Sequence, residues 1–207
     1  MKVLSQKLLI FVCILSLFAL AACSNSSETN STKESGKAGQ APKGNKTMYL
    51  GVISPPSTLN PINVSDINSQ MMSSILFETL FQLDDSMELR PKLAESIETD
   101  DFQNFVIKLN PKAKWTDGEP FTTEDIVFTL QLMANPKVVS TGLSALSVIE
   151  GLDEKGTLPE GQTDITGIKI VDPLTLNVKT KAPVDPNLIK EKLGNEIRFL
   201  PQHVLKD

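Results

Sequence analysis

Few side chains in this chain of 207 residues could carry out catalysis. His203 is the only histidine, and a tethered hydrolase would need it as the base beside a nucleophile. It lies four residues from the last residue, at a chain end that we expect to fray, so a satisfied or solvated histidine explains it better. We therefore keep a hydrolase as the weaker hypothesis and expect no catalytic residue.

Two adjacent carboxylate pairs, Asp84-Asp85 and Asp100-Asp101, could serve acid–base chemistry or bind a metal. Both pairs fall where we expect turns, and aspartate favours turns because its side chain hydrogen-bonds nearby backbone groups. The alternation of Asp or Asn closed by Glu that indicates a calcium loop is not present. The sequence therefore predicts neither a metal site nor a cofactor.

The cysteines indicate processing rather than redox chemistry. Lys2 and Lys7 precede an apolar run over 8–22, which is typical of a signal peptide and shorter than the roughly 20 apolar residues of a spanning helix. The run ends in Leu-Ala-Ala before Cys23, which resembles a bacterial lipobox. We predict a signal peptide over 1–22 and lipidation of Cys23. An ordinary signal peptide followed by a chance cysteine is the alternative.

The segment after Cys23 is predicted to be a tether. Residues 24–46 contain no aromatic residue and no Val, Ile, Leu or Met, so they cannot bury a core, and 23–46 would be a lipidated, disordered linker. Loss of Lys2 and Lys7 with the signal would take the formal net charge from −5 to −7, which argues against nucleic acid as a partner. We expect attachment to the membrane through lipid, on the outer side of the cell membrane or in the periplasm.

The elements that would position functional groups begin with a strand expected over 47–54. A helix should follow, capped by Ser65 or Asp66, with a core-facing side made of Met71, Met72, Ile75, Leu76, Thr79 and Leu80. Short strands are expected near 80–83, 93–98 and 104–109. In the last of them Phe105, Ile107 and Leu109 share one face.

The clearest helix should start at Thr122. With Thr122 as N-cap, Asp125 completes a capping box, and Phe121 and Ile126 stand at the hydrophobic-staple positions. The helix should stop before Asn135-Pro136. Beyond it we expect a weaker helix with loops over 138–161 and a hairpin over 168–179. That hairpin would turn at Asp172-Pro173, with Ile168 and Ile170 facing inward.

The same turn, cap and helix lie in a run that resembles a family signature. Residues 115–127, with an aromatic-Thr-Asp-Gly start and a Pro-Phe-Thr-x-x-Asp-Ile-Val end, resemble the family 5 extracellular solute-binding proteins, the oligopeptide-binding receptors of ABC importers. Six further blocks resemble the family in the same order: 59–61, 75–80, 90–96, 105–109, 167–172 and 200–205.

The resemblance implies a fold of mixed α+β or α/β class, the periplasmic-binding-protein-like type II (cluster C) fold. Family members have three lobes and more than twice this length. On this expectation 47–77 starts lobe I, 78–200 forms lobe II and 201–207 returns to lobe I, while lobe III is absent. The chain would then be truncated, as a fragment, a frameshift or a short paralogue, with exposed apolar side chains around Tyr49, Val52 and Ile53.

The resemblance also implies a monomeric, non-enzymatic receptor that captures extracellular peptides for an ABC permease. In the family, the loop after the first strand lines the cleft, and its backbone pairs with the peptide. Here that loop is 62–67. It suggests Asn63, Ser65 and Ile67 as ligand contacts and Asp66 as an anchor for a peptide amino group. Capping of the following helix by Ser65 or Asp66 is the competing interpretation.

The ligand is less closely defined than the fold. Residues 140–142 read Ser-Thr-Gly where peptide-binding relatives can place an aromatic side chain against the ligand. A receptor for nickel, haem, sugar or another solute therefore stays open. A peptide-pheromone sensor, an adhesin and a non-functional truncated paralogue stay open as well.

Overall fold

A four-stranded antiparallel sheet and the helix α3 form the centre of the structure. The computed structural model describes residues 48–206, and from Leu50 onward the chain forms one compact unit. The predicted signal peptide, Cys23 and the tether lie outside the described residues. None of the helices within 48–206 has the length and apolar character needed to cross a membrane.

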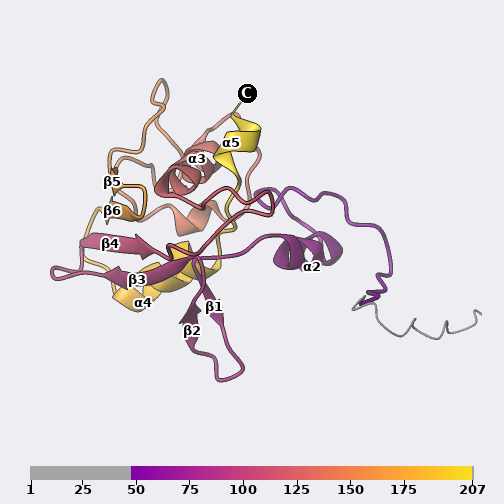
Figure 1. The fold of residues 1–207 in the computed structure, drawn as a ribbon. Coiled ribbons are helices and arrows are strands. Elements are labelled where there is room, and N and C mark those ends of the chain that lie inside the picture. Colours follow the sequence, from indigo (N-terminus) through magenta and orange to yellow (C-terminus); the bar gives the residue numbers. More distant parts are fainter. Residues whose placement is uncertain (1–47, 207) are drawn as a thin grey trace, which may run out of the picture. The chain divides into compact units, whose positions relative to one another are not determined.

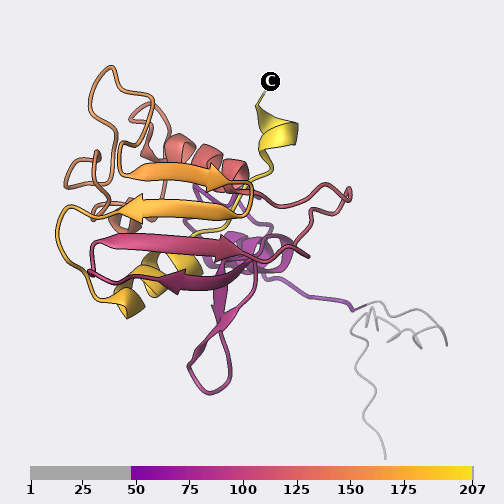
Figure 2. The ribbon, with the colours of Figure 1, turned by 60° about the vertical axis from the view of Figure 1, so that its left-hand side comes forward.

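The sheet consists of β3 (Ala94–Glu98), β4 (Asn104–Leu109), β5 (Ile168–Asp172) and β6 (Thr175–Lys179), in the order β3-β4-β6-β5. Figure 2 shows the four strands side by side with α3 against one face. In β4, Phe105, Ile107 and Leu109 are all buried, as their period-two spacing predicts. Ile107 lies opposite Leu176 of β6, so the central strand pair supplies part of the core.

The β5–β6 hairpin forms at the predicted place, but its outer strand is less buried than expected. Ile170 lies opposite the buried Leu176 and therefore shares its face of the sheet. Even so, 41% of Ile170 is exposed. The prediction that Ile170 faces inward was thus right about the face of the sheet and wrong about its burial. Ile170 stays partly exposed because β5 is an edge strand of the sheet.

Helix α3 (Thr123–Ala134) confirms the start and stop signals in the sequence. The predicted capping box is present, and Asp125 Oδ2 accepts the Thr122 N–H at 2.9 Å. Both staple residues, Phe121 and Ile126, are buried in the core. The hydroxyl and N–H of Thr123 donate to backbone carbonyls of the β5–β6 turn, which fixes the start of α3 against the sheet.

The other elements are short. They are the β1 (Phe81–Leu83) and β2 (Leu89–Pro91) hairpin, η1 (Leu143–Ala145), α4 (Pro186–Ile189), the π-helical turn η2 (Lys190–Asn195) and α5 (Gln202–Leu205). Figure 1 shows β1 and β2 as a hairpin separate from the sheet. Of the weaker helix with loops predicted over 138–161, the loops form, but the helix was wrong, because Gly142, Gly151 and Gly156 adopt positive φ angles, which interrupt an α-helix. Only the single turn η1 forms there.

The segment before the sheet departs most from expectation. Residues 48–54 form no strand, since no partner strand within 48–206 pairs with them. Tyr49, Val52 and Ile53 are exposed, as predicted. The helix α2 (Ile67–Leu76) forms, but it buries Ser69 and Ser73 and leaves Ile67, Ile75 and Leu76 exposed by 75%, 53% and 57%. The prediction that Ile75 and Leu76 face a core was wrong within the part of the chain that the structure describes.

Candidate functional site

Asp66 organises the predicted ligand loop. Its Oδ1 accepts the Ser69 N–H at 2.9 Å, which makes Asp66 the N-cap of α2. Its Oδ2 accepts the hydroxyls of Ser57 and Ser69. These hydrogen bonds, led by the one from Ser57, hold the pKa of Asp66 well below its ordinary value of 3.8, so the carboxylate is ionised at neutral pH. The capping interpretation is confirmed, and the ligand role stays a prediction.

The other predicted contacts lie on the same loop. Asn63 is half-buried, and its Oδ1 accepts the Thr58 hydroxyl at 3.3 Å. Ser65 and Ile67 are exposed, one on each side of Asp66. The structure therefore places all four predicted residues on one short segment, with Asn63 and Asp66 held by hydrogen bonds and the other two open to solvent.

A second loop fixes this segment from the side. The N–H and the hydroxyl of Thr141 both donate to the Ile62 carbonyl, at 2.7 and 3.2 Å. The aromatic-free loop at 140–142 is thus the support of the predicted ligand loop. Figure 1 allows the chain between these loops to be followed through α2, β1, β2, β3, β4 and α3.

A small cavity lies where these two loops meet the segment before α5. Its volume is about 70 Å³, and it is lined by Pro61, Ile62, Val64, Met133, Thr141, Gly142, Glu196, Ile197 and Arg198. Arg198 was not predicted as a site residue. The sequence does carry a signal for it, because this charged residue stands between the apolar residues Ile197 and Phe199. A charged side chain in a buried segment normally has a partner of opposite charge.

A larger concavity of about 630 Å³ lies elsewhere, between α3 and the loop at 158–163. It is an open groove, with Phe128, Leu132 and Pro159 among its lining residues. None of the predicted ligand contacts lines it, so its size alone does not assign it a role.

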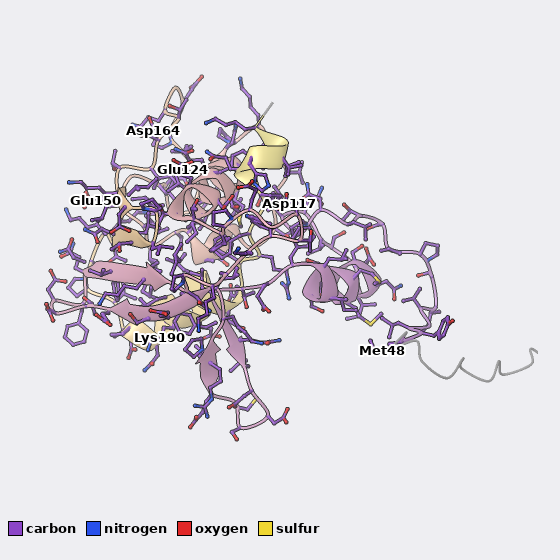
Figure 3. All side chains as sticks on the ribbon, viewed as in Figure 1. Met48, Asp117, Glu124, Glu150, Asp164 and Lys190 are labelled. Carbon is purple, nitrogen blue, oxygen red and sulfur yellow. The ribbon has the colours of Figure 1, made fainter. Side chains whose placement is uncertain are left out.

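His203 is fixed rather than frayed. Its Nε2 lies 2.7 Å from Asp117 Oδ2, and Figure 3 shows Asp117 beside α5. This hydrogen bond raises the pKa of His203 above 6.5 and lowers that of Asp117 below 3.8. The Gln202 N–H donates to Asp125 Oδ1 and further anchors the segment. The satisfied-histidine interpretation is confirmed, and the expectation of fraying at this position was wrong.

Two of the candidate acid–base carboxylates serve turns. Asp84 accepts the N–H groups of Ser86 and Glu88 in the β1–β2 hairpin, and Asp101 accepts those of Gln103 and Asn104 before β4. These backbone hydrogen bonds lower the pKa of Asp84 and of Asp101. Over the described range no group of three or more His, Cys, Asp or Glu side chains is arranged to hold a metal ion.

Comparison with known proteins identifies the family. A family profile described as bacterial extracellular solute-binding proteins, family 5 Middle, matches residues 88–203, more than half of the chain. The chain belongs to this family. The family 5 chain is 34% identical over 131 residues to the periplasmic oligopeptide-binding protein OppA of Escherichia coli. That alignment covers 61% of this chain and 24% of OppA. It is also 27% identical over 144 residues to the oligopeptide-binding protein AppA of Bacillus subtilis. That alignment covers 69% of this chain and 26% of AppA.

Solved structures of family 5 proteins confirm the predicted fold class. OppA of Burkholderia pseudomallei superposes with a TM-score of 0.60 at 27% identity, over 72% of this chain and 29% of that one. OppA of Haemophilus influenzae, in complex with RPPGFSPFR, superposes with a TM-score of 0.62 at 27% identity. The superposition covers 73% of this chain and 30% of that one. The family 5 chain thus spans about a quarter of the length of the curated relatives cited above.

Proposed function

We propose that this chain belongs to the substrate-binding component of an ABC importer and helps to capture oligopeptides outside the cell for delivery to a membrane permease. Relatives named as oligopeptide-binding proteins support the ligand class. The observation that carries the proposal is the 62–67 loop, which is held by its own helix cap and by Thr141 while Ser65 and Ile67 stay exposed. A loop fixed in this way loses little conformational entropy on binding.

In this proposal the loop recognises the peptide mainly through its backbone. Backbone groups of Ser65 and Ile67 would pair with an extended peptide as an added strand, which tolerates many peptide sequences. Asp66 would attract the peptide amino group. Its Oδ1 accepts one hydrogen bond, from Ser69, and a carboxylate oxygen can accept two. The cap and the ligand role are therefore compatible at one side chain.

The remaining expectations form part of the same proposal. A signal peptide over 1–22, lipidation of Cys23 and a tether over 23–46 would hold a monomeric body at the outer face of the membrane. Residues 47–77 would begin lobe I, 78–200 would form lobe II, and 201–207 would return to lobe I. The family is one of solute-binding proteins, so we propose no catalytic role.

Isothermal calorimetry with a pool of short peptides tests the proposal, after circular dichroism has shown that the protein is folded. We expect saturable heat, and an affinity about three- to tenfold weaker in Asp66→Asn. Asparagine retains the helix cap and removes the charge. Asp101→Asn is the matched control, because Asp101 is also a loop carboxylate that accepts backbone N–H groups.

Peptides with acetylated amino ends give the second arm. They should bind the wild type and Asp66→Asn equally. A folded protein that gives no heat with any peptide would contradict the proposed function, and saturable heat with nickel or haem instead would favour those receptors. Equal weakening in Asp66→Asn and Asp101→Asn would remove Asp66 from the site.

A further inference from the structure

Arg198 is held in place by the chain on both sides of it. Ile197, Phe199 and Leu200 are buried. The Phe199 ring packs edge-on against the Phe121 ring, with 5.7 Å between the ring centroids. The Leu200 N–H donates to the Thr129 hydroxyl at 2.9 Å. The backbone at Arg198 therefore has little freedom to move. Its side chain is half-buried and lines the cavity beside the 62–67 loop.

One nitrogen of the Arg198 guanidinium has no hydrogen-bond partner within residues 48–206. Its Nε is fully buried and donates to no acceptor there, and the side chain makes no ion pair in the same range. Burial lowers the pKa of Arg198, but an arginine stays protonated at neutral pH. A buried charged donor without an acceptor is unfavourable, so the position favours a group that supplies one.

The acidic side chains nearby do not supply that group. Glu196 lines the same cavity, but its Oε1 accepts Lys192 Nζ at 2.7 Å. Glu78 is exposed, and its charge acts on Arg198 without a contact at ion-pair distance in the described residues. The chain offers a contrast in its only other arginine, Arg90, which pairs with Asp84 and Glu88.

We propose that Arg198 and the cavity between the 61–64 loop and residues 141–142 form a subsite for a carboxylate carried by a bound peptide. The cavity of about 70 Å³ has room for a group of a few heavy atoms, since a water molecule occupies about 30 Å³ of liquid. A planar guanidinium binds a carboxylate through two parallel hydrogen bonds. Asp66 and Arg198 would then give the peptide one acidic and one basic contact. The inference names a ligand group for the proposed peptide site and so rests on that proposed function.

The subsite can be tested directly by NMR of the full chain, without any peptide. The Arg198 Nε–H resonance, assigned by its loss in Arg198→Gln, should shift saturably with acetate at millimolar concentration. It should not shift with chloride at the same ionic strength. Arg90 Nε–H is the internal control and should stay in place, since it already donates to Asp84 at 2.6 Å. No shift at Arg198 up to tens of millimolar acetate would overturn the proposal.

Calorimetry with three matched tripeptides then identifies the source of the carboxylate. The peptides are trialanine with a free carboxyl end, its amide, and the amide of Ala-Ala-Glu. Amidation should weaken binding about five- to twentyfold in the wild type and in Arg90→Gln but not in Arg198→Gln. Recovery of affinity by the Glu peptide would show that a side-chain carboxylate also fits. An equal amidation effect in both arginine variants would overturn the subsite.

The two measurements separate this inference from the function on which it rests. An acetate shift without peptide heat would support the subsite and contradict peptide capture. Peptide heat with no acetate shift and no dependence on Arg198 would support peptide capture and overturn the subsite.

Discussion

Helices α2 and α3 both start at a side-chain cap but pack in different environments. Asp66 caps α2, and the Thr122–Asp125 box caps α3. Helix α3 buries Ile126, Leu130 and Met133 against the core. Helix α2 buries two serines and leaves Ile75 and Leu76 exposed. A cap therefore fixes where a helix starts, whereas the burial of its apolar face depends on distant partner elements.

The largest difference should appear when one isoleucine is truncated in each helix. Ile126→Ala should lower the free energy of unfolding by about 2–5 kcal/mol, because it removes buried methyl groups and leaves a cavity. Ile75→Ala should change it by less than about 0.5 kcal/mol, because Ile75 is exposed. Urea unfolding followed by circular dichroism measures both. Equal losses would show that α2 is packed in solution.

Removal of the two cap carboxylates should give the next difference. Asp125 is buried and accepts N–H groups from Thr122, Trp115 and Gln202. Asp125→Ala should cost about 2–4 kcal/mol, because it leaves buried donors without acceptors. Asp66→Ala should cost less, with loss of helicity confined to α2. Amide hydrogen exchange distinguishes the two, and faster exchange in the sheet of Asp66→Ala would contradict this local effect.

The exposed apolar side chains of α2 should also be visible to an apolar dye. We expect the wild type to bind such a dye more strongly than Ile67→Glu/Leu76→Glu, which makes two of the exposed positions charged. The helical signal should be similar in the two proteins. If the dye fluoresced as weakly with the wild type as with a fully packed protein, that result would contradict the observed exposure.

The smallest effect should come from the His203–Asp117 pair at the end of the chain that packs beside α3. The raised pKa of His203 means that its contribution is complete below pH 6.5 and is lost as the pH rises through the folded value. The lowered pKa of Asp117 means that its contribution is present above pH 3.8 and is lost as the pH falls through the folded value. The pair therefore supports folding most in the mildly acidic range. NMR titration should return the pKa of His203 toward 6.5 in Asp117→Asn, and an unchanged pKa would contradict the pairing.

The predictable parts of the molecule are those specified by neighbouring residues. The capping box at Asp125, the buried face of β4 and the turn at Asp84 follow from short-range patterns, and all three were predicted. The exposure of Ile75 and the cavity at Arg198 were not. They depend on segments far apart in sequence, and residue spacing carries no information about such contacts.

The attachment of Thr141 to Ile62 responds differently to substitution at its two residues. Its acceptor is a backbone carbonyl, which every amino acid carries, so a substitution at position 62 cannot delete it. Its donors belong to residue 141, where valine would remove the hydroxyl bond and proline would remove the N–H. Heritable variation at residue 141 can therefore delete these two hydrogen bonds to the 62–67 loop, whereas a side-chain substitution at position 62 leaves their acceptor in place.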